Sequence, residues 1–266
     1  MTSSTLLSLA ALCALVPATI GAWRGIKGQS PIFWLLVAVA AAGPLVLIVK
    51  QFGGMWSTGL SETLWVTIFA SVVLFAFVSR RWREGWRLAP LLFPYLLLLG
   101  IFAAIWGQAP REQATTALRD PWILFHVVIA VVTYGLLTLA AIAGLAVLIR
   151  ERSMRSRRRS TLSDLLPSVA DAERLEVGLL TASEIVLGLG VLTGMGLQLA
   201  TTGNLLALDH KTLLTLGGFA VIAVLLFAHY GTGLRGRRAA RILLIGYLLV
   251  TLGFPGVKFV QDVLLT

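Results

Sequence analysis

Long apolar segments recur along almost the whole chain, and they constrain its fold more than any other feature. A helix needs about 20 mostly apolar residues to cross a bilayer. Eight runs are of about that length or longer, at residues 4–22, 32–49, 60–78, 88–106, 122–149, 177–200, 211–231 and 239–264. We therefore predict an all-α polytopic membrane protein with about eight transmembrane helices, forming a single membrane domain over residues 1–266.

The composition supports this class and excludes others. Hydrophobic residues make up 58% of the chain and charged residues only 13%, too few to cover the surface of a soluble domain. The formal net charge of +10 comes from Lys and Arg placed between apolar runs, so it indicates membrane orientation and not nucleic-acid binding. Cys13 is the only cysteine, which excludes a disulfide framework, a CxxC redox pair and a CxxCH motif.

Positive charge alternates between successive connections. The first, third, fifth and seventh connections hold most of it, at Arg24, Lys27, Arg80, Arg81, Arg83, Arg87, Arg150, Arg152, Arg155, Arg157, Arg158, Arg159, Arg235, Arg237, Arg238 and Arg241. The others hold few cations, at Lys50, Arg111, Arg119 and Lys211. By the positive-inside rule the odd connections are cytoplasmic and both termini lie outside. Residues 151–174 are predicted as a basic cytoplasmic loop, a helix extension followed by a linker, lying against anionic lipid headgroups.

Two of the runs have further features. The first, TLLSLAALCALVPATIGAW, lacks a preceding basic segment, so we expect a retained helix and not a cleaved signal peptide. The sixth carries small residues at regular intervals, which predicts close approach by another helix; they are Gly188, Gly190, Gly194 and Gly196.

The three histidines separate by depth. His126 follows Pro121 by five residues and His210 begins the seventh run, so both are expected near the outer surface. His229 lies about 28 Å further along a continuous helix, at the cytoplasmic end. Neutral imidazole is the ordinary protein ligand of heme iron, so His126 and His210 are candidate metal ligands if their helices are neighbours. A hydrogen bond to a carbonyl or headgroup is the alternative for each.

Polar groups near these histidines also have two interpretations. Asp209 is either the N-cap of the helix that starts at His210 or a partner that orients the His210 ring, and both roles are compatible. Lys211 is a candidate contact for a lipid headgroup or a heme propionate. Tryptophans at the outer boundary form an aromatic belt or line a porphyrin site; they are Trp56, Trp106 and Trp122.

Several segments resemble the cytochrome c assembly superfamily. They are LRDPWILFHVVIAVVTYGLLTLAAIAGLAVLIRER, GLGVLTGMG, LDHKTLLTLGGFAVIAVLLFAHYGTGLRGRRAA and GYLLVTLGFPGVKFV. Within it they resemble the CcsA-like branch, and most closely the YpjD group of inner-membrane proteins. The resemblance is specific over residues 65–260, the expected cytochrome c assembly-like core. It implies a multi-pass protein of the bacterial inner membrane, with heme b as cofactor and other cytochrome c biogenesis proteins as partners.

The resemblance also implies residue roles. His126 matches the family's outer heme-ligating histidine, Asp209 and Lys211 match the Asp and Lys of a WDPKE-like segment, and His229 matches a histidine proposed to hold heme at the cytoplasmic side. The chain departs from the pattern at GMGLQLATTGNLLALD, which lacks repeated Trp-Gly-Trp-Asp. Gln261 and Asp262 stand where a second outer histidine is expected, and His210 is predicted to replace that ligand.

The sequence therefore predicts a heme-binding or heme-handling membrane protein of the CcsA-like class, and not an enzyme in its own right. The predicted cofactor contacts are His126, His210, His229, Asp209, Lys211 and Trp122, with His126 and His210 as metal ligands. The alternative is a small-molecule or ion transporter, or a regulatory membrane subunit, that keeps the fold without heme. In that case Glu184, an acid inside the sixth run, matters more than His126.

Overall fold

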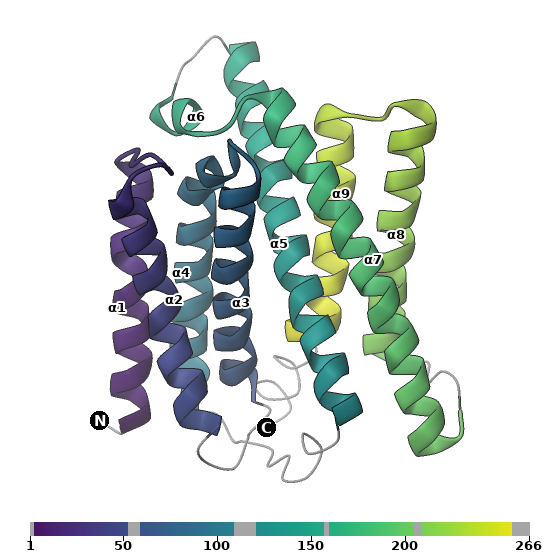
Figure 1. The fold of residues 1–266 in the computed structure, drawn as a ribbon. Coiled ribbons are helices and arrows are strands. Elements are labelled where there is room, and N and C mark those ends of the chain that lie inside the picture. Colours follow the sequence, from purple (N-terminus) through teal and green to yellow (C-terminus); the bar gives the residue numbers. More distant parts are fainter. Residues whose placement is uncertain (1–2, 53–58, 109–120, 157–159, 205–208, 257–266) are drawn as a thin grey trace.

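The computed structural model describes residues 3–52, 59–108, 121–156, 160–204 and 209–256. Long helices run side by side across the molecule (Figure 1), and no strand occurs within these ranges, which confirms the all-α prediction. The long helices are α1 (Ser3–Trp23), α2 (Pro31–Phe52), α3 (Leu60–Arg81), α4 (Ala89–Ile105), α5 (Pro121–Ser156), α7 (Val169–Thr202), α8 (His210–Thr232) and α9 (Gly236–Thr251). Trp56, Gln261 and Asp262 lie outside the described residues.

Short elements complete the described fold. A 3₁₀ turn at Gly85–Leu88 (η1) leads into α4, another at Trp106–Gln108 (η2) ends it, and a five-residue helix at Thr161–Leu165 (α6) joins α5 to α7. Seven helical segments of the described chain, α1 to α5, α7 and α8, are long and apolar enough to cross a membrane, with η1 extending α4. The α9 helix has 16 residues and continues into a π-helical turn at Leu252–Gly256 (η4). The prediction of about eight transmembrane helices is thus confirmed.

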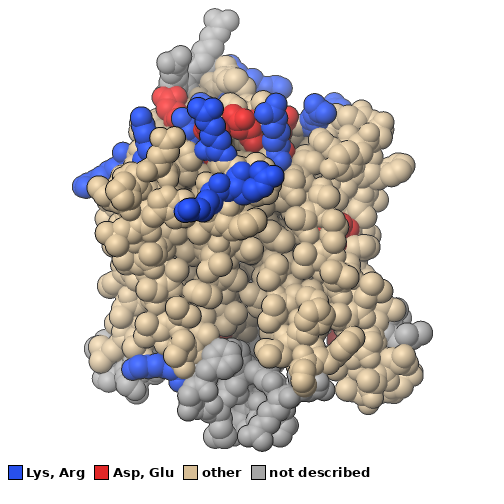
Figure 2. Space-filling model, in the orientation of Figure 1, with Lys and Arg blue, Asp and Glu red and all other residues tan. Residues whose placement is uncertain are grey.

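The helices alternate in direction, so every second connection lies at the same end of the bundle. Because most Lys and Arg lie in alternate connections, the two ends differ in charge. Lys and Arg gather across one end, the end where α6 lies in Figure 1, and a broad band with almost no charged surface covers the middle of the molecule (Figure 2). We call this the arginine-rich end; it holds the connections after α1, α3, α5 and α8. The other, where α5 and α8 begin, is the histidine end (Figure 1).

The helices form two groups of four. In the first, α1 packs on α2 and α4, and α3 packs on α2 and α4. Its interior is filled by large side chains that are almost completely buried, among them Trp65, Phe75 and Phe93. The rings of Phe75 and Phe93 meet edge to face with centroids 5.5 Å apart. In the second group α5 packs on α7 and α9, and α8 packs on α7 and α9. The two groups join mainly where α3 contacts α5.

Two helices are longer than a bilayer requires. The 36 residues of α5 and the 34 of α7 correspond to about 54 and 51 Å, against a hydrocarbon core of about 30 Å. The helix extension predicted after residue 149 is present in α5, and α7 begins at Val169, eight residues before the predicted span at 177, because its polar flanking sequence is also helical. Ser168 caps the start of α7 by accepting a hydrogen bond from the Asp171 N–H.

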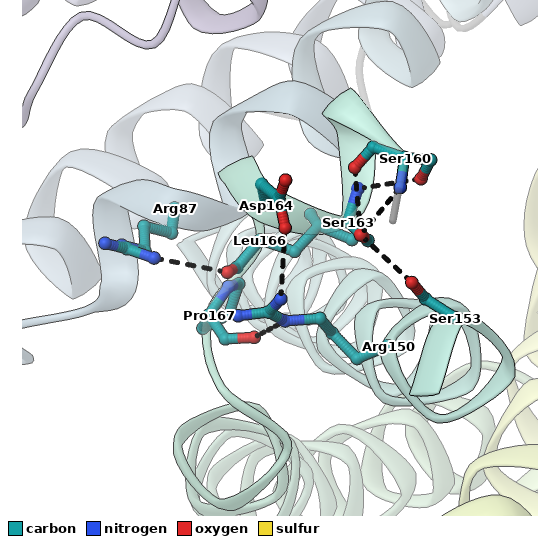
Figure 3. A network of polar contacts seen from close by, with 8 residues as sticks. All are labelled: Arg87, Arg150, Ser153, Ser160, Ser163, Asp164, Leu166 and Pro167. Carbon is teal, nitrogen blue, oxygen red and sulfur yellow. Dashed lines mark hydrogen bonds and ion pairs between the residues drawn. The ribbon is translucent and has the colours of Figure 1, made fainter. Parts of the chain in front are cut away.

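Two arginines hold residues 160–168 in place by donating hydrogen bonds to backbone carbonyl groups of this segment (Figure 3). Arg150 donates from Nε to the Pro167 carbonyl at 3.0 Å, and Arg87 of η1 donates to the Leu166 carbonyl at 3.3 Å. Leu166 itself is fully buried, and Ser163 is hydrogen-bonded to Ser160 in a capping box. Residues 160–168 are thus docked on the bundle, where the sequence predicted a linker, because buried apolar contact and two guanidinium groups offset the cost of ordering them.

Candidate functional site

A cavity of about 360 Å³ lies among α5, α7, α8 and the end of α9. This size falls within the range of small-molecule sites, about 300–1,000 Å³. Most of its wall is apolar, including Val127, Leu187, Val191, Leu197, Leu216 and Val250. Polar side chains also line it, chiefly His126, Gln198, Asp209, Lys211, Thr212 and Thr215. We call it the histidine cavity, because His126 brings an imidazole into an otherwise mainly apolar wall.

Glycines of α7 let α5 approach closely enough to place His126. A Cβ added to Gly194 would lie 3.1 Å from Cε1 of His126, and one added to Gly196 would lie 3.3 Å from Cζ2 of Trp122. A Cβ added to Gly190 would likewise lie 3.2 Å from Cγ2 of Ile129. The packing of α5 on α7 is among the most extensive in the described fold. The small-residue face predicted from the sequence is therefore confirmed, and it carries the histidine.

Hydrogen bonding favours one tautomer of His126. Its Nδ1 lies 2.9 Å from Oγ1 of Thr193, and that hydroxyl donates its single proton to the Gly190 carbonyl at 3.1 Å. Both hydrogen bonds can form together only when the hydroxyl accepts from the ring, with the imidazole proton on Nδ1 and the lone pair on Nε2. A metal-binding histidine is commonly oriented in this way, through its other nitrogen.

Asp209 is the N-cap of α8. Its Oδ1 accepts a hydrogen bond from the Thr212 N–H at 2.7 Å, as one of the two sequence interpretations required. Hydrogen bonding from Thr212, through its side chain and its backbone, is the main cause that holds the pKa of the Asp209 carboxyl below its ordinary value. The charge of Lys211 contributes in the same direction. The cap fixes the first turn of α8, and with it the position of Lys211 in the cavity wall.

The other predicted contacts at this end lie differently. His210 is exposed at the first position of α8 and is not among the residues that line the histidine cavity, whereas its neighbours Asp209 and Lys211 are. Of the two predicted metal ligands only His126 lines the cavity, and ligation by the pair stays a prediction. Trp122 is half exposed and donates from Nε1 to the Thr193 carbonyl at 3.2 Å, one turn from His126.

His229 lies at the arginine-rich end, because α8 is continuous from His210 to Thr232. Its Nδ1 is 2.9 Å from the Leu234 carbonyl, which can only accept, so the ring donates there. The side chain of Tyr230 meets the ring edge to face at 5.1 Å. The hydrogen bond ties the turn between α8 and α9 to the end of α8. The predicted separation of His210 and His229 to opposite ends is confirmed.

A cluster of tyrosines adjoins the histidine cavity and was not predicted. Tyr134 lines the cavity, and its hydroxyl lies 3.3 Å from those of Thr251 and Tyr247; the hydroxyl of Tyr247 is 2.5 Å from that of Tyr95. These contacts join α4, α5 and α9. A sequence signal existed for the first member, since residues 126, 130, 133 and 134 share one helical face. No local pattern indicated Tyr95 or Tyr247.

Glu184 is placed away from this cavity. Both of its carboxyl oxygens are buried, and neither has a hydrogen-bond partner among the residues that the structure describes. Glu176, two turns earlier on α7, is only 3% exposed, and its Oε1 would lie 3.5 Å from a Cβ placed on Gly144 of α5. A functional role for Glu184 stays a prediction.

The described fold and cavity define a multi-pass helical membrane protein with a histidine-bearing small-molecule cavity near one membrane face. Residues 23–265 match the profile of the family described as Cytochrome C assembly protein, which covers most of the chain. The chain belongs to this family. The match begins earlier than the core of residues 65–260 expected from the sequence segments.

Individual relatives match all or nearly all of the chain. It is 48% identical over 270 residues to the "Uncharacterized 28.8 kDa protein in nifR3-like 5'region" of Azospirillum brasilense, covering 100% of both chains. It is 25% identical to Inner membrane protein YpjD of Escherichia coli (strain K12), covering 95% of this chain and 94% of the relative. The chain is also 25% identical to Cytochrome c biogenesis protein CcsA of Synechococcus sp. (strain CC9902), over 92% of this chain and 89% of the relative. These matches agree with a CcsA-like branch near YpjD.

Proposed function

We propose that the protein binds and handles heme as a CcsA-like member of its family, with the histidine cavity as the heme site. The observation that carries this proposal is the state of His126, which has its proton held on Nδ1 by Thr193 and its lone pair on Nε2. A neutral imidazole with a free lone pair is the form that ligates heme iron. The relatives named Cytochrome c biogenesis protein CcsA support the class.

The chemistry of the cavity wall fits b-type heme. Heme is a large, flat, apolar molecule with an iron at its centre and two propionate carboxylates at one edge, and the iron supplies the positions to which imidazole binds. The apolar wall suits the ring, and Lys211 offers a cation to a propionate.

We propose that His210 would supply a second ligand to the iron. It stands between Asp209 and Lys211, both of which line the cavity, at the first residue of α8. Met195 is the competing group, because it lines the cavity itself and a thioether is also a ligand of heme iron. Trp122 would shield the site on the α7 side, since it packs over Gly196 one turn from His126. His229 would contact heme only at the arginine-rich end.

We further propose that the protein lies in a bacterial inner membrane, with the arginine-rich end in the cytoplasm and both termini outside. The name of the YpjD relative supports the location, and the gathering of Lys and Arg at one end supports the orientation (Figure 2). In this placement the histidine cavity lies near the outer face. The protein would act with other cytochrome c biogenesis proteins by holding or passing heme, without catalysing a reaction itself.

An absorption spectrum of the purified protein, before and after hemin addition, tests the proposal. We expect a Soret band that is lost in His126→Ala and shifted or weakened in either His210→Ala or Met195→Leu, which tells the two candidate ligands apart. Tyr230→Phe, an exposed aromatic change at the other end, serves as the control and should leave the band unchanged. A protein that takes up no hemin, or a band that survives in His126→Ala, would contradict the assignment.

A second candidate function is favoured by one observation. Both carboxyl oxygens of Glu184 are buried without a hydrogen-bond partner among the described residues, and an acid within a membrane segment is a functional hypothesis. A transporter or regulatory subunit without heme would depend on this carboxyl. In that case Glu184→Gln should impair growth or transport while His126→Ala does not; under the heme proposal the order is reversed.

A further inference from the structure

A second hollow, of about 700 Å³, opens at the arginine-rich end beside the turn between α8 and α9. Its charged lining consists of Glu151 and five arginines: Arg155, Arg235, Arg237, Arg238 and Arg241. We call it the arginine hollow. It is separate from the histidine cavity in its position and in every residue that lines it.

The positive-inside rule explains why arginines occur at this end, but it does not explain where these are placed. Arg237, Arg238 and Arg241 lie in the first two turns of α9, and no acidic residue lies in its first turn. The N-terminus of a helix carries partial positive charge, so cations there are unfavourable. Arg235 is the N-cap, and its side chain makes no capping hydrogen bond to the first N–H groups of the helix. The arrangement thus concentrates positive charge around the start of α9, where the carboxylates of Glu151 and Glu173 also lie close to Gly236.

Other arginines at the same end are engaged by the protein itself. Arg150 and Arg87 donate to the carbonyls of Pro167 and Leu166 (Figure 3). In contrast, within the described part of the chain, no arginine of the hollow forms an ion pair. Glu151 is the one acid in the lining, and its Oε1 would lie 2.7 Å from a Cβ placed on Gly236. Gly236 has a φ of +65°, so only glycine suits both this conformation and the contact with Glu151.

The level of the hollow along α8 indicates which anion it meets. Val224, Phe227 and Tyr230 are 66%, 80% and 69% exposed, and they lead along α8 to Thr232 and Gly233 in the hollow. In a membrane helix such exposed apolar side chains face lipid. The hollow therefore begins where the lipid-facing surface ends, which is the level of the headgroups.

We propose that the arginine hollow is a binding site for a phosphoryl group, supplied by the headgroup of an anionic phospholipid. Guanidinium groups bind phosphate oxygens through paired hydrogen bonds, and an uncapped helix N-terminus adds backbone donors to the same anion. A bound phosphate offsets the repulsion among the arginines and satisfies the start of α9. The site does not depend on heme and is independent of the function proposed for the histidine cavity.

Native mass spectrometry of the detergent-purified full chain tests this site. With phosphatidylglycerol added, we expect retained lipid on the native protein, and about tenfold or greater loss of retention in the double variant Arg237→Gln/Arg241→Gln. The matched control, Arg24→Gln/Arg152→Gln, removes two exposed cations outside the hollow and should keep retention near the native level.

Two further probes distinguish the sources of the phosphoryl group. Phosphatidylcholine, whose own cation neutralises its phosphate, should be retained less than phosphatidylglycerol. Inorganic phosphate at millimolar concentration should compete only weakly; if it displaces the lipid and binds alone, the phosphoryl site stands and its ligand is the free anion. Equal loss in the site and control variants would overturn the proposal, as would a native protein that retains neither probe. Hemin uptake, measured on the same samples, should be the same in the native protein and in both double variants.

Discussion

The two hollows of this molecule differ in how they treat charge. The histidine cavity is mainly apolar, and its central polar group is the imidazole of His126, whose Nδ1 lies 2.9 Å from the Thr193 hydroxyl. The arginine hollow is twice as large and is lined by five guanidinium groups with one carboxylate. Both lie in the second group of four helices, and α5 contributes to each. The difference shows that one bundle can hold an imidazole in an apolar wall at one end and a cluster of guanidinium groups at the other.

A substitution that disturbs the packing of α5 on α7 should have the largest effect on the histidine cavity. In Gly194→Val the new side chain meets the His126 ring, because a Cβ there already lies 3.1 Å from Cε1. We expect loss of the hemin-dependent Soret band and a fall in stability of about 1–3 kcal/mol, measured by thermal unfolding in detergent. The control is Gly217→Val on α8, where an added Cβ has no neighbour within 4 Å. Similar behaviour of the two variants would show that the cavity does not depend on this contact.

The Thr193 hydroxyl tests the tautomer argument. Thr193→Val removes the acceptor of the His126 Nδ1–H and keeps the shape of the side chain. Removing such an orienting partner costs about 10–100-fold in metal affinity, so hemin titration should show a weaker site by that factor. Thr193→Ser keeps the hydroxyl and should bind hemin nearly as the native protein does. If valine and serine bind equally well, the hydroxyl does not hold the ring.

The N-cap of α8 predicts a smaller effect that depends on pH. Asp209→Ala should lower stability by about 1 kcal/mol. Because the native pKa of Asp209 is lowered, its contribution is complete above the ordinary pKa of a carboxyl and is lost as the pH falls through the native value. Thermal unfolding at neutral and at acidic pH should therefore separate native protein and variant only at neutral pH. A difference that persists in acid would contradict this role.

The smallest expected effect is the most direct check that the hollows are independent. Arg237→Gln/Arg241→Gln should leave the hemin titration unchanged, and His126→Ala should leave phosphatidylglycerol retention unchanged, because the two linings share no residue. Both measurements use the samples described above. A change in either crossed measurement would mean that the hollows are coupled.

The sequence predicted the fold well because its strongest signals are local. Apolar runs fix where helices cross, and alternating charge sorts their connections to two ends; both follow from properties of single segments. The extension of α5 past the membrane was predicted, but the start of α7 at Val169 was not, because apolar length says nothing about a helix that continues in water. The docked segment at residues 160–168 was missed for a related reason. Its order depends on Arg87, which lies on a distant element.

The candidate site was predictable only in part. His126 and Lys211 could be found by residue type, and both line the cavity. The hydrogen bonds that orient His126 could not be predicted. Thr193 and the Gly190 carbonyl have no recognisable role until the structure shows that α7 faces α5. Tyr247 and Tyr95 are far from Tyr134 in the sequence, so their contact is a tertiary property. That His210 lies outside the cavity lining could not be predicted either, because its spacing along the chain does not say which side of α8 faces the cavity.

The seam between the two groups of helices has a consequence for how the chain can be divided. The first group has a filled interior of its own, and it meets the second mainly through α3 and α5 and through the Arg87 contact with Leu166. A chain cut between α4 and α5 would yield two membrane fragments with complementary faces. Produced together, such fragments should find each other again in the bilayer, with Arg87 closing the joint from one side and residues 160–168 from the other.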